Sequence, residues 1–217
     1  MKHLCVQVPK DAVGSFNAIP AQLLVKAVEV LGYLRNLPNL PSSDLVEFLA
    51  YGGFRIGESK FITWGDCDFK RGEIIARGSP ETGLKGRHVG ESRIVPMIPD
   101  MRKLLERMKA ERPNEDPETP VMRVWECQKS IDRASKVLGL KRITHHELRH
   151  LFATRCIESG VDIPTVSRWL GHKDGGALAM KTYGHLRNEH SQKMAQKVTF
   201  SASPANFDLK RHLAPSI

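Results

Sequence analysis

The chain has 217 residues, 41% of them apolar, which is enough for one large domain with a hydrophobic core and excludes a disordered chain. Its formal net charge is +9. Such a balance favours an anionic partner, most commonly nucleic acid, and the alternative is a basic enzyme whose charge only keeps it in solution.

The first third of the chain is expected to be mainly helical. Residues 1–15 are irregular and are interpreted as an extended lead-in, whereas 19–36 have helical periodicity. A second helix is expected to start near Ser42 to Asp44, after two prolines, and to break at Gly52 and Gly53. A short helix should follow at about 55–62.

The middle of the chain changes character. Two short runs of β-forming residues, 72–77 and 92–97, flank a stretch rich in glycine and charge. This pattern predicts a β-hairpin or small sheet with a long basic loop. Helices are then expected over 99–112, with a proline at the start, and over 124–139, ending at a glycine.

The rest of the chain is expected to be helical with short breaks, over about 145–159, 164–170, 178–186 and 189–197. Residues 201–217 are weakly patterned and are interpreted as a C-terminal tail. The sequence contains neither an internal repeat nor a low-complexity tract. The expected fold is therefore mainly α with a small antiparallel β-sheet, an α+β class.

The four cysteines are scattered and form no C-x-x-C pair, so neither a zinc ribbon nor a redox motif is indicated (Cys5, Cys67, Cys127 and Cys156). Neither a cleavage signature nor a membrane-length apolar run is present. We therefore expect free thiols, a reducing cytoplasmic setting and no membrane association.

Residues 146–150 match the pattern H-E-x-x-H, which on a helix can offer two zinc ligands and a general base. Two observations argue against a metal site. The longer form of the motif would place glycine and histidine where this chain has Ala153 and Cys156. Arg149 falls on the same helical face as His146 and His150, where a fixed cation would repel a metal ion.

The same face has two other interpretations. An arginine flanked by histidines can donate charge-assisted hydrogen bonds to a phosphate, so it would form an anion site. Alternatively, His146, Arg149 and His150 are merely solvated on a surface helix whose opposite side, with Leu148 and Phe152, faces the core. The choice depends on the rest of the chain.

Further motifs occur in a fixed order around this face. Arg55 lies in "GFRIGE" with Glu58 three residues later, His172 ends "WLGH", and Tyr183 lies in "KTYGH". Together with the H-x-x-R of residues 146–149, they resemble the catalytic domain of the tyrosine recombinases, the phage-integrase family. The resemblance covers roughly residues 40–190, and it is specific because separated positions agree in type, order and approximate spacing.

The resemblance implies a tyrosine-recombinase catalytic-domain fold and a site-specific DNA recombinase. Such an enzyme cuts and rejoins DNA through a covalent 3′-phosphotyrosyl intermediate, with chemistry like that of type IB topoisomerases and without cofactor or metal. The implied catalytic residues are Arg55, Lys85, His146, Arg149, His172 and the nucleophile Tyr183. The lysine is assigned by position, because Lys85 is the only lysine between Lys70 and Lys103.

Elementary chemistry fits these roles. Attack on a phosphodiester builds negative charge on its non-bridging oxygens, which Arg55 and Arg149 can neutralise with guanidinium groups that never deprotonate. His172 can add a donor, and His146 can serve as base for a tyrosine whose pKa is ordinarily about 10. Lys85 is the candidate acid for the leaving oxygen. Glu58 and His150 are candidate supporting residues, whereas Glu147, Asp66 and Trp169 are expected either to be architectural or to support the catalytic residues indirectly.

Bland alternatives exist for each residue taken alone. Arg55 could be a structural partner of Glu58, Lys85 a solvated loop lysine, His172 a helix-terminal residue and Tyr183 a core tyrosine. Residues 160–173 also resemble a helix-turn-helix, which would suit a non-catalytic DNA-binding regulator. A regulator would require neither Tyr183 nor Arg55.

The resemblance also sets expectations for organisation and partners. Residues 16–200 would form the catalytic domain, and the N-terminal core-binding domain usual in the family is absent from this chain. The tail would dock on a neighbouring protomer, within a tetramer on double-stranded DNA, although the isolated domain could be monomeric. The expected task is integration or excision of a phage or other mobile element, in a bacterial cytoplasm at the nucleoid.

Overall fold

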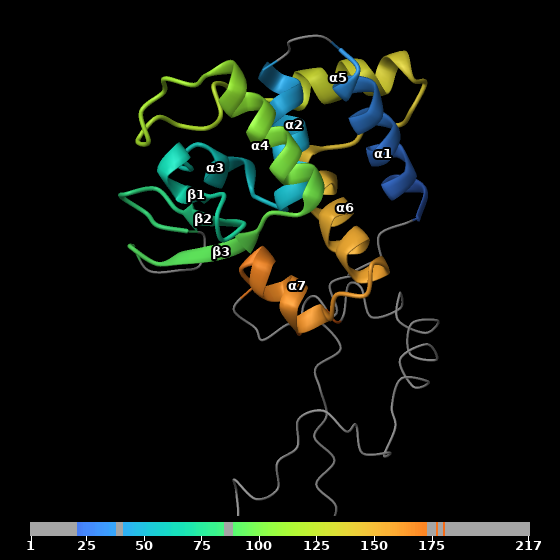
Figure 1. Ribbon diagram of the computed structural model, residues 1–217. Helices are drawn as coiled ribbons and strands as arrows, with labels where there is room; N and C mark the ends of the chain where they lie inside the picture. Colours follow the sequence, from blue (N-terminus) through green and yellow to red (C-terminus); the bar gives the residue numbers. More distant parts are fainter. Residues whose placement is uncertain (1–20, 38–40, 85–88, 173–176, 178–179, 181–217) are drawn as a thin grey trace, which may run out of the picture. The chain divides into compact units, whose positions relative to one another are not determined.

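A computed structural model describes residues 21–37, 41–84, 89–172, 177 and 180. Most of them lie in helices that pack around a central one (Figure 1). The helices are α1 (Ala21–Arg35), α2 (Pro41–Gly52), α3 (Ile56–Ser59), α4 (Pro99–Glu111), α5 (Gln128–Val137), α6 (His145–Glu158) and α7 (Ile163–Leu170). The central helix is α2, which contacts α1, α4 and α6.

A small antiparallel sheet lies beside this helical part. Its strands β1 (Cys67–Asp68), β2 (Glu73–Arg77) and β3 (Ser92–Pro96) lie in that order, and a 3-10 turn, Trp64–Asp66, precedes β1. Ile74 pairs with Val95, and both side chains are fully buried, whereas Ile94 points outward and is 53% exposed. This alternation follows from the two-residue period of a strand and gives the sheet one core face.

Side chains of α2 and the turn that follows it contribute to a core that also includes residues of the other helices and the sheet. Phe48 of α2 is completely buried, and its ring stacks on that of Phe54 with 4.8 Å between centroids. Gly53 lies between α2 and Phe54 with φ +59, a left-handed conformation that glycine adopts at no steric cost. The turn therefore directs Phe54 back onto α2 and sends the following residue outward.

The fold class expected from the sequence is confirmed: the described chain is mainly helical with one three-stranded antiparallel sheet. Two features differ. The helix expected from 124 begins at Gln128, after a segment of bends, and its N-cap residue Cys127 has non-helical backbone angles. Strand β1 is too short to produce an alternating pattern, so sequence periodicity did not reveal it.

Several expected segments lie outside the described residues. They are the lead-in at 1–15, the C-terminal tail at 201–217 and most of the two last expected helices, at 178–186 and 189–197. Among the helices that are described, none has the length and apolar character needed to cross a bilayer.

Three cysteines are described, and all are free and buried, in agreement with the expectation of unpaired thiols (Cys67, Cys127 and Cys156). Burial raises the pKa of each of these thiols to about 12. A thiol with so high a pKa stays protonated at neutral pH and is a poor metal ligand or nucleophile. These cysteines are therefore core residues.

We expect replacement of Phe48 by alanine to cost about 3 to 5 kcal/mol of unfolding free energy, because it empties a fully buried site and removes the stack on Phe54. Val137→Ala is the matched control, since Val137 is 60% exposed, and should change stability by less than about 0.5 kcal/mol. Urea unfolding followed by circular dichroism measures both. Equal effects of the two substitutions would contradict this description of the core.

Candidate functional site

Helix α6 begins with a capping box formed by Thr144 and Glu147. The Thr144 side chain accepts a hydrogen bond from the His146 amide, and a Glu147 carboxylate oxygen accepts from the Thr144 amide at 2.7 Å. Both groups satisfy polar atoms that a helix start leaves without partners. Glu147 therefore has an architectural role, as expected. The pattern T-x-x-E of residues 144–147 is a sequence signal of this cap that the zinc-like motif had obscured.

The side chain of Arg149 is buried, with only 4% of the residue exposed. Its guanidinium donates to the Gly53 carbonyl at 2.5 Å and to the Leu170 carbonyl at 2.6 Å. These carbonyls belong to the turn before Arg55 and to the end of α7, two residues before His172. The interpretation of Arg149 as a solvated surface residue is therefore wrong, because α7 and the Gly53 turn cover that side of α6.

Arg55 and Glu58 form a paired turn at the start of α3. A Glu58 oxygen accepts from the Arg55 amide at 2.8 Å, and the other oxygen accepts from the Arg55 guanidinium at 2.8 Å. The Arg55 side chain is 29% exposed, whereas that of Glu58 is 5% exposed. The Glu58 carboxylate thus fixes the orientation of Arg55 and leaves part of its guanidinium exposed to solvent.

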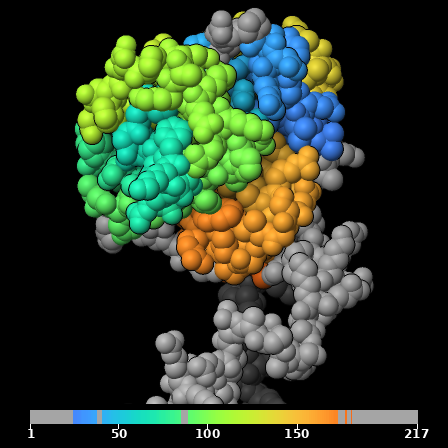
Figure 2. All heavy atoms as spheres, in the orientation of Figure 1, coloured from blue at the N-terminus to red at the C-terminus, as the bar shows by residue number. Residues whose placement is uncertain are grey.

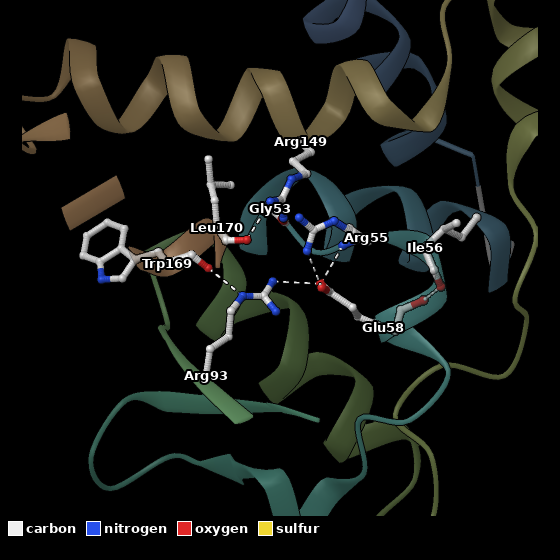
Figure 3. A network of polar contacts seen from close by, with 9 residues as sticks. Gly53, Arg55, Ile56, Glu58, Arg93, Arg149, Trp169 and Leu170 are labelled. Atoms are coloured by element: carbon white, nitrogen blue, oxygen red, sulfur yellow. Dashed lines mark hydrogen bonds and ion pairs between the residues drawn. The ribbon is translucent and has the colours of Figure 1, made fainter. Parts of the chain in front are cut away.

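Arg93 of β3 is a third arginine at this site, and sequence reasoning missed it. Its guanidinium donates to Glu58 at 2.8 Å and to the Trp169 carbonyl at 2.8 Å, and its side chain is only 3% exposed (Figure 3). A signal was present: Arg93 is in phase with buried Val95 on the inward face of the strand. A charged residue in that register requires a buried partner.

The electrostatics of the site are dominated by positive charge. Burial raises the pKa of the Glu58 carboxyl, but Arg93, the Arg55 amide, the Arg55 side chain and Arg149 together lower it below its ordinary value. Glu58 is therefore ionised at neutral pH. Arg55 and Arg93 pair with this carboxylate, and Arg149 acts on it through its charge. Guanidinium groups gathered in this way attract anions.

Histidines extend the site along α6. The rings of His146 and His150 meet edge to face, with 4.6 Å between centroids. Desolvation and the charge of Arg149 lower the pKa of His146, and Arg55 contributes in the same direction. Burial, together with His146 and more weakly Arg149 and His172, lowers the pKa of His150 to about 4. Both imidazoles are therefore predominantly neutral at pH 7 in the absence of an anion.

His172 follows the C-terminal end of α7. Gly171 caps that helix in the left-handed conformation, and the His172 amide donates to the Ser167 carbonyl at 3.0 Å. His172 lowers the pKa of His150 through its charge, which places the two side chains in one electrostatic environment. The structure thus brings together Arg55, Arg149 and the three histidines.

The remaining sequence-based assignments divide into two groups. Asp66 accepts from the Thr63 amide and pairs with Arg77, and the Trp169 carbonyl holds Arg93, so both are architectural as expected. Lys85 and Tyr183 lie outside the described residues. In the part of the chain that the structure describes, His, Cys, Asp and Glu side chains form no cluster of three suited to a metal ion.

Comparison with known proteins defines the class. The model of the phage integrase family matches residues 24–190. A tyrosine recombinase XerA of Thermococcus onnurineus is 33% identical over 182 residues, which cover 78% of this chain and 60% of that protein. A tyrosine recombinase XerC of Corynebacterium glutamicum is 27% identical over 161 residues, covering 69% of this chain and 48% of that protein. The chain belongs to the phage integrase family, that of the tyrosine recombinases.

Solved structures agree on the fold. The catalytic domain of bacteriophage HP1 integrase matches with a TM-score of 0.59 at 19% identity, covering 84% of this chain and 96% of that one. The Tn1549 transposon integrase, in complex with transposon right end DNA, matches with a TM-score of 0.61 at 17% identity, covering 88% and 69%. The expected recombinase catalytic-domain fold is therefore confirmed.

The lowered pKa of His150 predicts a loss of stability in acid. The unfolded chain binds the imidazole proton near pH 6.5 and the folded chain only near about 4, so acidification through that window favours unfolding. Between about pH 7 and about pH 5, titration of this group should lower the free energy of unfolding by about 1 to 2 kcal/mol. This figure allows for screening at a partly exposed side chain. Urea unfolding of wild type and His150→Gln at both pH values measures it. The variant should lose less stability on acidification, and an identical loss would contradict the depressed pKa.

Proposed function

We propose that this domain cuts and rejoins DNA strands at specific sites through a covalent 3′-phosphotyrosyl intermediate, with Tyr183 as the nucleophile. The observation that carries the proposal is the arginine site, where Glu58 orients a partly exposed Arg55 and two backbone carbonyls orient Arg149. A phosphodiester at this place would be attracted by both guanidinium groups. Membership of the family indicates the type of reaction, and the arginines of the site can stabilise the negative charge that develops during it.

The two arginines would act on the scissile phosphate. Attack by an oxygen nucleophile adds charge to the non-bridging oxygens, and donors fixed beforehand stabilise that charge without reorganising during the reaction. Arg149 is fixed by two backbone carbonyls and Arg55 by Glu58. A guanidinium has five N–H donors, so being held in this way is compatible with donating to an anion.

Proton transfer would fall to the neighbouring residues. His146, neutral because desolvation and Arg149 lower its pKa, is suited to take the proton of the Tyr183 hydroxyl as attack begins. His172 would donate to the phosphate, with His150 as a supporting residue. Lys85 would protonate the 5′-oxygen as it leaves. Rejoining reverses these transfers, and the phosphotyrosyl bond conserves the energy of the phosphodiester, so this route requires no cofactor.

The biological setting is part of the proposal. We assign residues 16–200 to the catalytic domain and double-stranded DNA as the partner, with a tetramer of the whole protein on its DNA. Integration or excision of a mobile element in the bacterial cytoplasm is the proposed task, and the Tn1549 integrase, whose fold this domain shares, offers a precedent. A non-catalytic DNA-binding regulator, the rival interpretation, has no use for the buried Arg149 and Arg55–Glu58 arrangement.

A nicked suicide substrate tests the nucleophile. Wild-type protein in EDTA should form a covalent protein–DNA adduct that survives denaturation, because the tyrosine bond traps the cut strand. Tyr183→Phe should form none, since it lacks the attacking oxygen, while its DNA affinity stays the same. An adduct of equal yield with the variant would overturn the assignment of Tyr183. A requirement for zinc would overturn the proposed mechanism as a whole.

Two arginines of α6, Arg149 and Arg155, allow the effect of a catalytic guanidinium to be distinguished from that of positive charge alone. Arg149→Lys should slow adduct formation by about 10²- to 10³-fold, the usual effect of removing one preorganised donor. Arg155→Lys is the control, because Arg155 has a side chain 62% exposed and pairs only locally with Glu158. Single-turnover kinetics at saturating DNA, on variants shown to be folded by circular dichroism, measures both. Equal rates in the two variants would remove Arg149 from the mechanism.

A further inference from the structure

We propose that Arg93 is a positioning residue that couples the supports of the two phosphate-binding arginines; this inference rests on the proposed function. Arg93 itself is only 5% exposed. It acts through other groups, because so buried a guanidinium is not at the surface that DNA would contact. Its partners, and not its own contact with substrate, define the role.

The first partner is the carboxylate that holds Arg55. A single Glu58 oxygen accepts from both Arg93 and the Arg55 amide, at 2.8 Å each, and the other oxygen accepts from the Arg55 guanidinium. Arg93 thus sets the orientation of the carboxylate plane. A rotation of Glu58 would move the Arg55 guanidinium with it, since one carboxylate oxygen accepts a hydrogen bond from that guanidinium.

The second partner is the C-terminal end of α7. The carbonyls of Trp169 and Leu170 are consecutive. Arg93 donates a hydrogen bond to the first, and Arg149 donates one to the second. Figure 3 shows the resulting chain of contacts, which runs from Arg55 through Glu58 and Arg93 to α7 and on to Arg149. A shift of this helix end would displace the Arg149 guanidinium directly.

Packing reinforces the polar contacts. The Arg93 guanidinium lies over the ring of Phe54 at 5.4 Å from its centroid. A Cβ atom added to Gly171 would stand 2.8 Å from Cδ of Arg93, and Gly171 has φ +74. The arginine stem therefore fills the space beneath the turn that leads to His172. One side chain of β3 thereby contacts the segments that carry two implied catalytic residues, Arg55 and His172.

The strand that carries Arg93 gives the coupling a further consequence. β3 pairs with β2 along its whole length, and Arg93 is opposite Ala76. In the sequence, Lys85 lies between these two strands. Arg93 joins β3 to the arginine site. It is therefore placed to fix the position of the two strands that flank Lys85 relative to Arg55 and Arg149.

The chain contains a matched control for Arg93. Arg112 is also buried, donates to the carbonyls of Met108 and Val121, and pairs with Glu115. Its guanidinium lies over the ring of Trp64 at 5.0 Å, much as Arg93 lies over a phenylalanine. None of these contacts involves the arginine site. Replacement of either arginine by lysine keeps the charge but loses the planar fork that reaches two acceptors at once.

The test compares Arg93→Lys with Arg112→Lys in single-turnover cleavage of the nicked substrate. Arg93→Lys should slow adduct formation by about 10²-fold, the effect expected of a displacement of about 1 Å in the reacting groups. The DNA concentration at half-saturation should change by less than about twofold, because Arg93 does not contact DNA. Arg112→Lys should lower Tm about as much as Arg93→Lys does, but it should leave the cleavage rate unchanged.

A spectroscopic measurement separates this inference from the proposed function. In ¹⁵N NMR spectra of the free protein, the Arg149 Nε resonance should shift in Arg93→Lys and stay in place in Arg112→Lys. If wild type forms no adduct but this shift occurs, the coupling stands and strand transfer fails. An unmoved resonance, or a wild-type cleavage rate in Arg93→Lys, overturns the inference, and so does an equal loss of rate in both lysine variants.

Discussion

The carboxylate of Glu58 is the interaction on which the site depends. A carboxylate with 5% side-chain exposure would be costly to ionise alone, yet Arg93 and the main chain and side chain of Arg55 keep it charged. In return, it fixes both guanidiniums in defined directions. The contacts that keep the carboxylate charged therefore also orient Arg55, one of the arginines that we propose to bind the phosphate.

The backbone does as much to build this site as the side chains do. Arg149 is held by the carbonyls of Gly53 and Leu170, and Arg93 by that of Trp169. Two of these carbonyls end α7, where the helix dipole favours cations. Because main-chain atoms move only with their helices, the arginines inherit the rigidity of the core. On the face that Figure 2 shows, the atoms of α4 and α7 adjoin those of the sheet region.

Sequence reasoning succeeded where local periodicity or a motif carried the information. The helices, the hairpin and the order of Arg55, the H-x-x-R pair and His172 followed from patterns within short windows. It failed at Arg93, because the strand register indicates that this arginine needs a buried partner but does not identify partners 35 and 76 residues away. The helical pattern by itself also did not decide whether Arg149 is solvated or belongs to a binding site. Helical phase shows which residues share a face but not what covers that face.

By itself, therefore, the sequence determined the fold class, the family and the identity of the candidate residues, because these depend on residue type, spacing and order. Tertiary structure alone decided that Arg149 is buried and that Glu58 holds two arginines. The physical reason is that burial and ion pairing depend on segments distant in the chain: the turn at Gly53, strand β3 and the end of α7. Because these segments meet at Arg149 and Glu58, the residues of an apparent zinc motif lie beside a cluster of arginines.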